Sequence, residues 1–143
     1  MKISAKAEYA IKAMYEIALC SQNNMTTTVK DIAAQQKIPK AYLEQLIGDL
    51  KKAGLVRSRR GAKGGYSLAR DSEAITAGEI IEAIEGPVKG AVCNCYIGCD
   101  CVETDSCVAH DVVSQLTSKM DEVLSGITLK SLIDKHYIEE EEQ

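Results

Sequence analysis

Apolar residues recur at helical spacing near the start of the chain. The positions that share one face are Ala7, Ala10, Ile11, Met14, Ile17 and Ala18. This spacing predicts an amphipathic first helix, which ends at Asn23-Asn24. The threonines at 26–28 are placed to cap a second helix over Val29–Gln36. That helix ends before Ile38-Pro39, because the residue before a proline avoids the helical region.

A third helix starts near Pro39 and stops at Gly54, which is placed like a C′ glycine. One face of it is apolar and carries Leu43, Leu46, Ile47 and Leu50. Two short helices joined by a three-residue turn form a helix-turn-helix. Residues 55–57 and 66–68 read as strands, and the glycines and cations between them are typical of a hairpin turn. The pattern predicts a winged helix-turn-helix head.

Beyond the wing, Thr76-Ala77-Gly78-Glu79 matches a capping box for a helix over Ala77–Glu85, which Gly86-Pro87 ends. A Cys-rich loop occupies 88–106. The following apolar seam consists of Val108, Val112, Val113, Leu116, Met120, Val123, Leu124 and Ile127. It predicts a long helix that packs on another helix. We expect the same helix of a second chain, with packing against the chain's own head as the alternative; Thr128 can cap a last short helix.

Charge is divided unevenly along the 143 residues. Residues 1–70 hold 13 Lys and Arg against 5 Asp and Glu, whereas residues 71–143 hold 4 against 16. This division suits a DNA-binding head on a separate acidic body. Residues 1–12 carry four charges and no continuous apolar stretch, and no later stretch approaches membrane-spanning length. We therefore expect a cytoplasmic protein without a membrane partner.

The second helix of a helix-turn-helix enters the major groove, so its N-terminal half supplies candidates for base contacts. These candidates are Lys40, Tyr42, Glu44 and Gln45. Gln pairs with adenine, Glu accepts from cytosine, and Lys or Tyr holds phosphate. On the wing, Arg59, Arg60 and Lys63 are placed to enter the minor groove, whose negative potential attracts arginine. Each charge taken alone could equally be a solvated surface residue; the wing's four cations, Arg57 included, favour DNA.

Several motifs in order resemble one known family. They are Met1-Lys2-Ile3-Ser4 before a Tyr9-containing helix, Tyr42-Leu43-Glu44-Gln45, Gly54-Leu55-Val56, Arg60-Gly61-Ala62-Lys63-Gly64-Gly65-Tyr66, Ile75-Thr76-Ala77-Gly78-Glu79-Ile80-Ile81 and Ile127-Thr128-Leu129. The chain resembles, nearly end to end, the Rrf2 family of winged helix-turn-helix regulators. The resemblance implies that Tyr42, Glu44, Gln45 and Arg60 contact double-stranded operator DNA. It also implies dimerisation through the long helix, and a two-fold homodimer prefers inverted-repeat operators.

Five cysteines lie between residues 93 and 107. Cytosolic thiols stay reduced, so such a cluster indicates a soft metal or an iron–sulfur centre rather than disulfides. The pairs Cys93-x-Cys95 and Cys99-x-Cys101 are too close for a zinc knuckle. The spacing Cys95-x5-Cys101-x5-Cys107-x2-His110 supplies three thiolates and an imidazole, and four such ligands can hold a [2Fe–2S] cluster.

This spacing is similar to the cluster-binding pattern of IscR-type family members, which implies that Cys95, Cys101, Cys107 and His110 are the ligands. Cys93 and Cys99 form a second x5 pair and are alternative ligands. Glu8 lies where NsrR-like members donate a carboxylate from the partner subunit to a [4Fe–4S] cluster. The simpler interpretation of Glu8 is a surface ion pair with Lys12 at i, i+4.

Two further residues have ordinary interpretations. We expect Cys20 to be a buried small hydrophobe and His136 to be a surface residue of the last helix. Nothing in the sequence pairs the cysteine cluster with a substrate pocket, a Gly-rich phosphate loop or a nucleophile–base set. No enzyme, catalytic residue or small-molecule substrate is expected.

The fold class expected is therefore mainly α: a winged helix-turn-helix head with a two-stranded wing, a Cys-rich loop and a long dimerisation helix. We divide the chain into a DNA-binding head at 1–87, a cluster-binding loop at 88–107, dimerisation and C-terminal helices at 108–138, and a disordered acidic tail at 139–143. The function expected is an iron–sulfur-sensing, DNA-binding transcriptional regulator. The alternatives are a [4Fe–4S] sensor of nitric oxide or iron, a thiol or zinc switch, and an electron-transfer protein.

Overall fold

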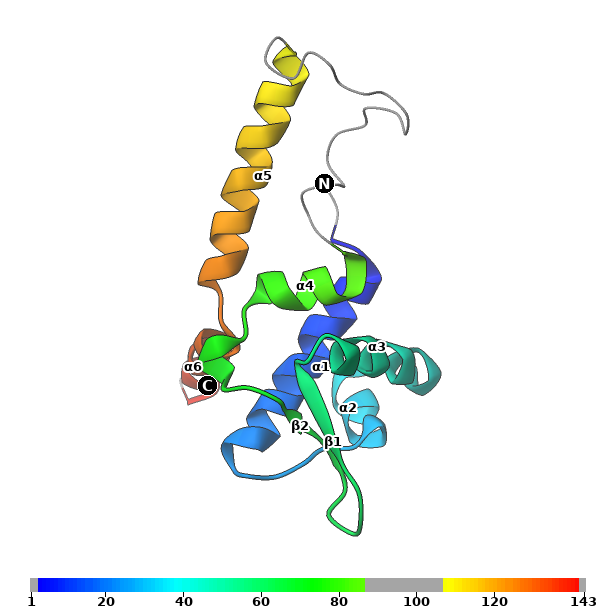
Figure 1. Cartoon of the computed structure of the whole chain (residues 1–143). Coiled ribbons are helices and arrows are strands. Elements are labelled where there is room, and N and C mark those ends of the chain that lie inside the picture. Colours follow the sequence, from blue (N-terminus) through cyan, green and yellow to red (C-terminus); the bar gives the residue numbers. More distant parts are fainter. Residues whose placement is uncertain (1–2, 87–106, 142–143) are drawn as a thin grey trace.

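The structure is a computed structural model that describes residues 3–86 and 107–141, with side chains up to His136. Figure 1 shows a helical head with a hairpin at one end and one long helix rising from the other side. The elements in chain order are α1 (Ala5–Gln22), α2 (Val29–Gln36), α3 (Lys40–Lys52), β1 (Val56–Arg59), β2 (Gly65–Leu68), a 3-10 turn η1 (Ser72–Ala74), α4 (Ala77–Glu85), α5 (Val108–Gly126) and α6 (Leu129–Glu141).

Helix starts follow the capping residues that the sequence predicts. The N–H of Asp31 donates to Thr28 Oγ1 at the start of α2 (3.2 Å). At the start of α4, the N–H of Glu79 donates to Thr76 Oγ1 (3.2 Å), and the N–H of Thr76 donates to the Glu79 carboxylate (3.0 Å). The predicted capping box is therefore confirmed. Partial burial acts to raise the pKa of Glu79, but its bonds with Arg70 and Thr76 lower it overall.

The helix-turn-helix is confirmed by α2 and α3. Between them Lys37 adopts a left-handed conformation (φ 55°), and Ile38 anchors the turn in the core with 3 % of its surface exposed. The α3 helix ends at Lys52 with Ala53 as its C-cap, and Gly54 follows in the left-handed region (φ 77°), which glycine adopts without steric cost. Leu43, Leu46, Ile47 and Leu50 are buried, as the periodicity predicts.

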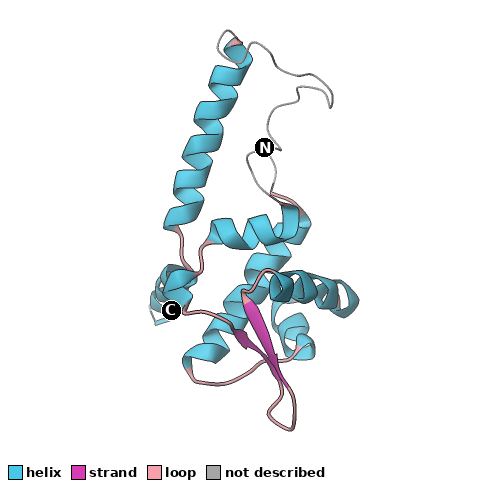
Figure 2. Ribbon diagram, in the orientation of Figure 1, coloured by secondary structure: helices cyan, strands magenta, loops and turns pink. Residues whose placement is uncertain are grey.

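The wing is a two-stranded antiparallel sheet (Figure 2). Val56 pairs with Leu68, Arg57 with Ser67, Ser58 with Tyr66, and Arg59 with Gly65. The first strand extends two residues beyond the predicted 55–57, and the second begins one residue before the predicted 66–68. Each extension follows from the other, because the Arg59–Gly65 pair lengthens both strands of the ladder.

The last helix belongs to the head. Leu129 and Ile133 of α6 are buried in the same core as Met14 and Ile17 of α1 and Ile80 of α4. The core therefore includes both ends of the chain, which the division at residue 87 does not anticipate. The helix also continues to Glu141, three residues past the predicted end at 138. Glutamate is a good helix former, so an acidic run need not end a helix.

The α5 helix rises from the head (Figure 1) and begins at Val108, as predicted. Its base is tied to α4 and α6: the N–H of Ala77 donates to the Ile127 carbonyl (2.8 Å), and the N–H of Leu129 donates to the Ile75 carbonyl (3.0 Å). Higher up, part of the predicted seam faces solvent, with Val108 at 80 % and Val112 at 61 % exposure. None of the helices in the described ranges is long and apolar enough to span a membrane.

Candidate nucleic-acid interface and sensor residues

The recognition helix presents a polar surface opposite its buried face. Lys40, Glu44 and Gln45 are exposed on α3, as expected for residues that reach bases or phosphates. Tyr42 is only half-buried: its ring meets Tyr9 of α1 edge to face, with ring centroids 5.6 Å apart. This ring contact holds one side of Tyr42 against the first helix and leaves the other side open to solvent.

The cationic side chains of the wing are exposed to solvent. Arg57, Arg59, Arg60 and Lys63 are all exposed. The turn returns into β2 through Gly65, whose φ is +146° and where a Cβ would approach the Thr27 carbonyl oxygen to 2.5 Å. Only glycine fits this position, so the hairpin can lie directly against the α1–α2 loop.

Two threonines that the sequence pattern marks only as possible helix caps hold the wing in place. Thr27 and Tyr66 exchange two backbone hydrogen bonds (3.1 and 2.7 Å), and Thr26 Oγ1 donates to the Lys63 carbonyl (2.9 Å). On the other side, Lys51 Nζ donates to Ser58 Oγ (2.9 Å) and links the end of α3 to β1. Threonine is enriched in strands, so the run at 26–28 is a weak strand signal that could have indicated this pairing.

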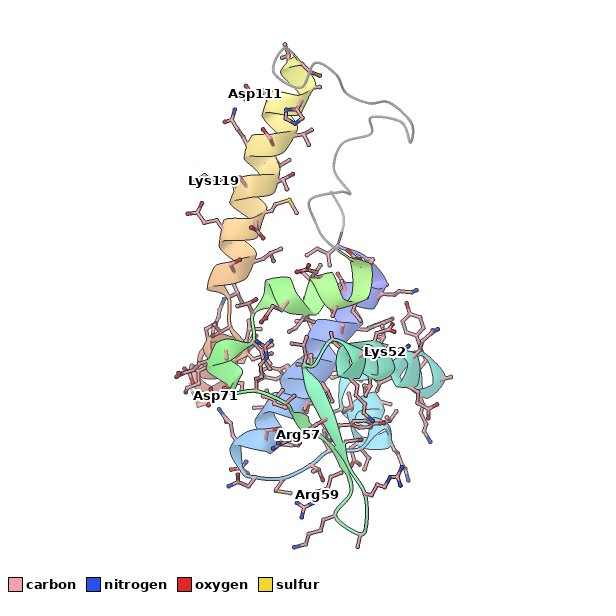
Figure 3. All side chains as sticks on the ribbon, in the orientation of Figure 1. Lys52, Arg57, Arg59, Asp71, Asp111 and Lys119 are labelled. Atoms are coloured by element: carbon pink, nitrogen blue, oxygen red, sulfur yellow. The ribbon has the colours of Figure 1, made fainter. Side chains whose placement is uncertain are left out.

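These contacts bring the DNA-binding candidates together. The wing lies beside α3, with Lys52 on one side of the hairpin and Arg57 and Arg59 on the other (Figure 3). The exposed residues of α3 and of the wing tip thus belong to one end of the head. A helix that enters a major groove beside a hairpin that enters the adjacent minor groove requires this arrangement.

The candidate sensor residues that the structure describes lie at the start of α5. Cys107 is the N-cap residue, its side chain makes no capping bond, and it is half-buried and not in a disulfide. His110 is half-buried three residues later, on the same face of the first turn. Cys93, Cys95, Cys99 and Cys101 lie outside the described residues. Within the described ranges, no three His, Cys, Asp or Glu side chains gather into a metal site.

Glu8 is exposed in the first turn of α1. The expected ion pair with Lys12 is not formed between these two described residues; Lys12 Nζ instead lies 6.0 Å from the centre of the Tyr9 ring. The first turns of α1 and α5 lie apart in Figure 1. A carboxylate from Glu8 could therefore meet Cys107 only from another chain.

The structure contradicts the expectation for Cys20 and agrees with the expectation for His136. Cys20 is half-buried rather than buried, because it lies near the end of α1 where the helix leaves the core. His136 is exposed on α6, as expected, and its ring meets Tyr15 of α1 edge to face with centroids 5.8 Å apart.

Comparison with known sequences supports the same conclusion as the motifs. Residues 3–135 match the Rrf2 family, described as an iron-dependent transcriptional regulator. The HTH-type transcriptional regulator IscR of Vibrio cholerae serotype O1 is 41 % identical over 133 residues, which cover 93 % of this chain and 75 % of that protein. IscR of Yersinia enterocolitica is 37 % identical over 138 residues, covering 96 % and 82 %.

Solved structures share the architecture. CymR (YrzC), the global cysteine regulator of B. subtilis, superposes with a TM-score of 0.78 at 35 % identity, covering 94 % of this chain and 98 % of that one. T. potens IscR superposes with a TM-score of 0.77 at 34 % identity, covering 95 % and 88 %. The mainly helical winged fold is thereby confirmed, and the family consists of transcriptional regulators rather than enzymes. The chain belongs to the Rrf2 family of winged helix-turn-helix transcriptional regulators and is similar to IscR and CymR.

Proposed function

We propose that this IscR-type regulator binds inverted-repeat operator DNA as a homodimer and carries an iron–sulfur cluster on Cys95, Cys101, Cys107 and His110. The observation that carries the proposal is the Cys107–His110 pair at the first turn of α5, preceded by Cys101 and Cys95 with five residues between successive cysteines. The iron-dependent description of the family and the similarity to IscR support it. A regulator of this kind acts on DNA, and we place it in the cytoplasm.

The donor set fits such a cluster. Thiolates are the usual ligands of iron–sulfur clusters, and imidazole nitrogens replace some of them in [2Fe–2S] centres. The Cys107 side chain makes no capping bond, and both Cys107 and His110 are half-buried. Both side chains can therefore bind a cluster without unwinding α5. When bound, the cluster supplies sensitivity to iron supply and redox state. His110 completes a four-ligand set, which favours [2Fe–2S] over a [4Fe–4S] cluster that uses Glu8.

The fold offers a direct route from the sensor to the head. The base of α5 is bonded to residues 75–77, and α4 packs against both α1 and α3. A shift of α5 would therefore act on α4, and α4 packs against the recognition helix α3. Two ligand positions at the top of α5 would bias that position when they are held by the cluster.

The exposed seam supports the dimer. Val108, Val112, Leu116 and Val123 are large apolar side chains that face solvent in a single chain. The same helix of a second copy would cover them in a two-fold arrangement, and a two-fold dimer reads inverted repeats. Leu124 instead faces α4, so the predicted alternative of packing against the head applies to the base of α5 alone.

Metal analysis tests the cofactor. Protein purified without oxygen should contain iron and acid-labile sulfide in equal amounts, about two of each per chain for [2Fe–2S]. About four of each, lost on Glu8→Ala, would instead support the [4Fe–4S] alternative. Stoichiometric zinc without sulfide would contradict the iron–sulfur proposal and support the zinc-switch alternative, while the DNA-binding role would remain.

A further inference from the structure

An open groove runs along the side of the wing that faces away from α3. Its volume is about 860 Å³, and its walls come from the end of α1, the α1–α2 loop, both wing strands and residues 69–72. Arg57 and Arg59 line it from β1, and Arg70 lines it beyond β2. Figure 3 shows Arg57 and Arg59 on this side of the hairpin, opposite Lys52. None of these three residues is needed for base reading by α3.

The two arginines of β1 can offer their positive charge to a ligand in the groove. Successive side chains of a strand alternate in direction, so Arg57 and Arg59 share one face. Arg57 Nε donates to Ser67 Oγ (3.3 Å), and no bond engages its two terminal nitrogens in the described part of the chain. Arg59 is exposed and has no ion pair with any described residue. Arg70, by contrast, is committed to Glu79 at 2.8 Å.

Neutral hydrogen-bonding side chains accompany these charges. Gln22 and Asn24 line the groove, as does Thr26, whose hydroxyl hydrogen is already donated to the Lys63 carbonyl. Arginine together with small neutral donors is the usual set that contacts DNA phosphates. Among the described residues, Asp71 is the one carboxylate of the lining. It belongs to the segment after β2, away from the hairpin tip, and its side chain accepts from the N–H of Glu73 (2.9 Å).

The dimensions of the DNA minor groove indicate which part of DNA can lie in this protein groove. A minor groove is only about 6 Å wide and is bounded by a sugar–phosphate backbone on each side. A hairpin tip that enters it must therefore have one backbone along each of its faces. One face of this hairpin adjoins α3, and the other is the wall of the groove lined by Arg57 and Arg59.

We propose that this groove holds the second sugar–phosphate backbone of the minor groove entered by the wing, with Arg57 and Arg59 as its phosphate ligands. The inference rests on the proposed DNA-binding function and extends the interface beyond the recognition helix and the wing tip. The wing then contacts a DNA backbone on each of its two faces. Thr26 and Thr27 fix the hairpin against the α1–α2 loop and so set the width of the groove.

The test compares wild-type protein with Arg57→Ala/Arg59→Ala on a duplex that the wild type selects from a random pool. Each lost phosphate contact reduces the magnitude of the negative slope of log K against log[salt] by about 0.9, so the magnitude should be about 1.8 smaller for the double variant. Phosphate ethylation should cease to interfere on one strand bordering the wing's minor groove and should still interfere elsewhere. Arg57→Lys should keep the wild-type slope, because it keeps the charge. Lys119→Ala, which removes an exposed charge on α5, should also keep it.

An unchanged slope and ethylation pattern in the double variant, with wild type bound normally, would overturn this inference and leave the proposed function intact. Failure of the wild type to select any DNA would overturn both.

Discussion

Gly78 of α4 packs directly against Leu124 of α5: a Cβ at Gly78 would lie 3.4 Å from the Leu124 Cβ. The contact lies beside the two backbone bonds that join residues 75–77 to residues 127–129. Together they fix the base of the sensor helix on α4, which packs on α1 and α3. The small residue at 78 thus sets how closely α5 approaches the head.

Substitution at Gly78 should separate packing from helix propensity. Gly78→Leu should destabilise the protein by about 1–3 kcal/mol, because its side chain would force α5 away from α4. Gly78→Ala is the matched control: its methyl reaches only ordinary contact distance, and alanine favours the helix by about 1 kcal/mol over glycine. Denaturant unfolding of both variants measures the difference. A Gly78→Leu variant as stable as Gly78→Ala would show that this junction adapts freely.

Two substitutions on the proposed DNA surface should differ in kind. Gln45→Ala should relax discrimination at one base pair by roughly 1–3 kcal/mol. Arg60→Ala should weaken binding most on sites with a narrow minor groove, where the negative potential is strongest. Fluorescence anisotropy with single-base variants of the selected duplex and with A-tract and mixed-sequence flanks measures both effects.

Salt gives an independent check on the same surface. With about six phosphates contacted, wild-type affinity should fall by ~10³-fold or more between about 50 and 200 mM salt. Binding that ignores salt, or full-strength binding by Gln45→Ala/Arg60→Ala, would place the DNA surface elsewhere.

The apolar seam of α5 can be tested by charge. Leu116→Asp should give monomeric or insoluble protein, because a carboxylate buried between two helices has no partner. Ser118→Asp adds the same charge on the same helix at an exposed position away from Leu116 and should remain dimeric. Sedimentation equilibrium distinguishes them. A stable wild-type monomer would mean that the exposed side chains of α5 have no partner helix.

The proposed ligand set predicts which thiols matter. Replacing Cys95, Cys101 or Cys107 with Ala should remove bound iron and visible absorption, whereas Cys93→Ala and Cys99→Ala should retain both. His110→Cys should retain a cluster with a lower reduction potential, because a thiolate adds negative charge to the centre. Loss of iron from Cys93→Ala or Cys99→Ala as complete as from Cys95→Ala would show that the other x5 register binds the cluster.

Local chemistry explains what the sequence could predict. The Thr76–Glu79 capping box, the Thr28 cap and the Gly54 stop depend on residues within a few positions of one another, and all three are confirmed. The head as a winged helix-turn-helix follows from their order. The long α5 helix and its start at Val108 follow from the spacing of its apolar residues.

Contacts between distant segments explain what it could not. Leu129 and Ile133 enter the core through contacts with residues more than a hundred positions earlier, and a short amphipathic helix does not reveal its partner. Tyr42 is half-buried because Tyr9 lies beside it, and Thr26 and Thr27 pair with the wing across about forty residues. Burial and pairing of this kind depend on tertiary packing rather than on local propensity.

The central claim is that one chain couples an iron–sulfur cluster to DNA binding. The most direct measurement compares the operator affinity of anaerobically purified wild type with that of Cys107→Ala at one salt concentration, using the duplex that the wild type selects. Because ligands at the top of α5 bias a helix bonded to the head, the two proteins should differ in affinity by about tenfold or more, a coupling of roughly 1.4 kcal/mol. Equal affinities for protein with and without the cluster, both dimeric and folded, would contradict the account.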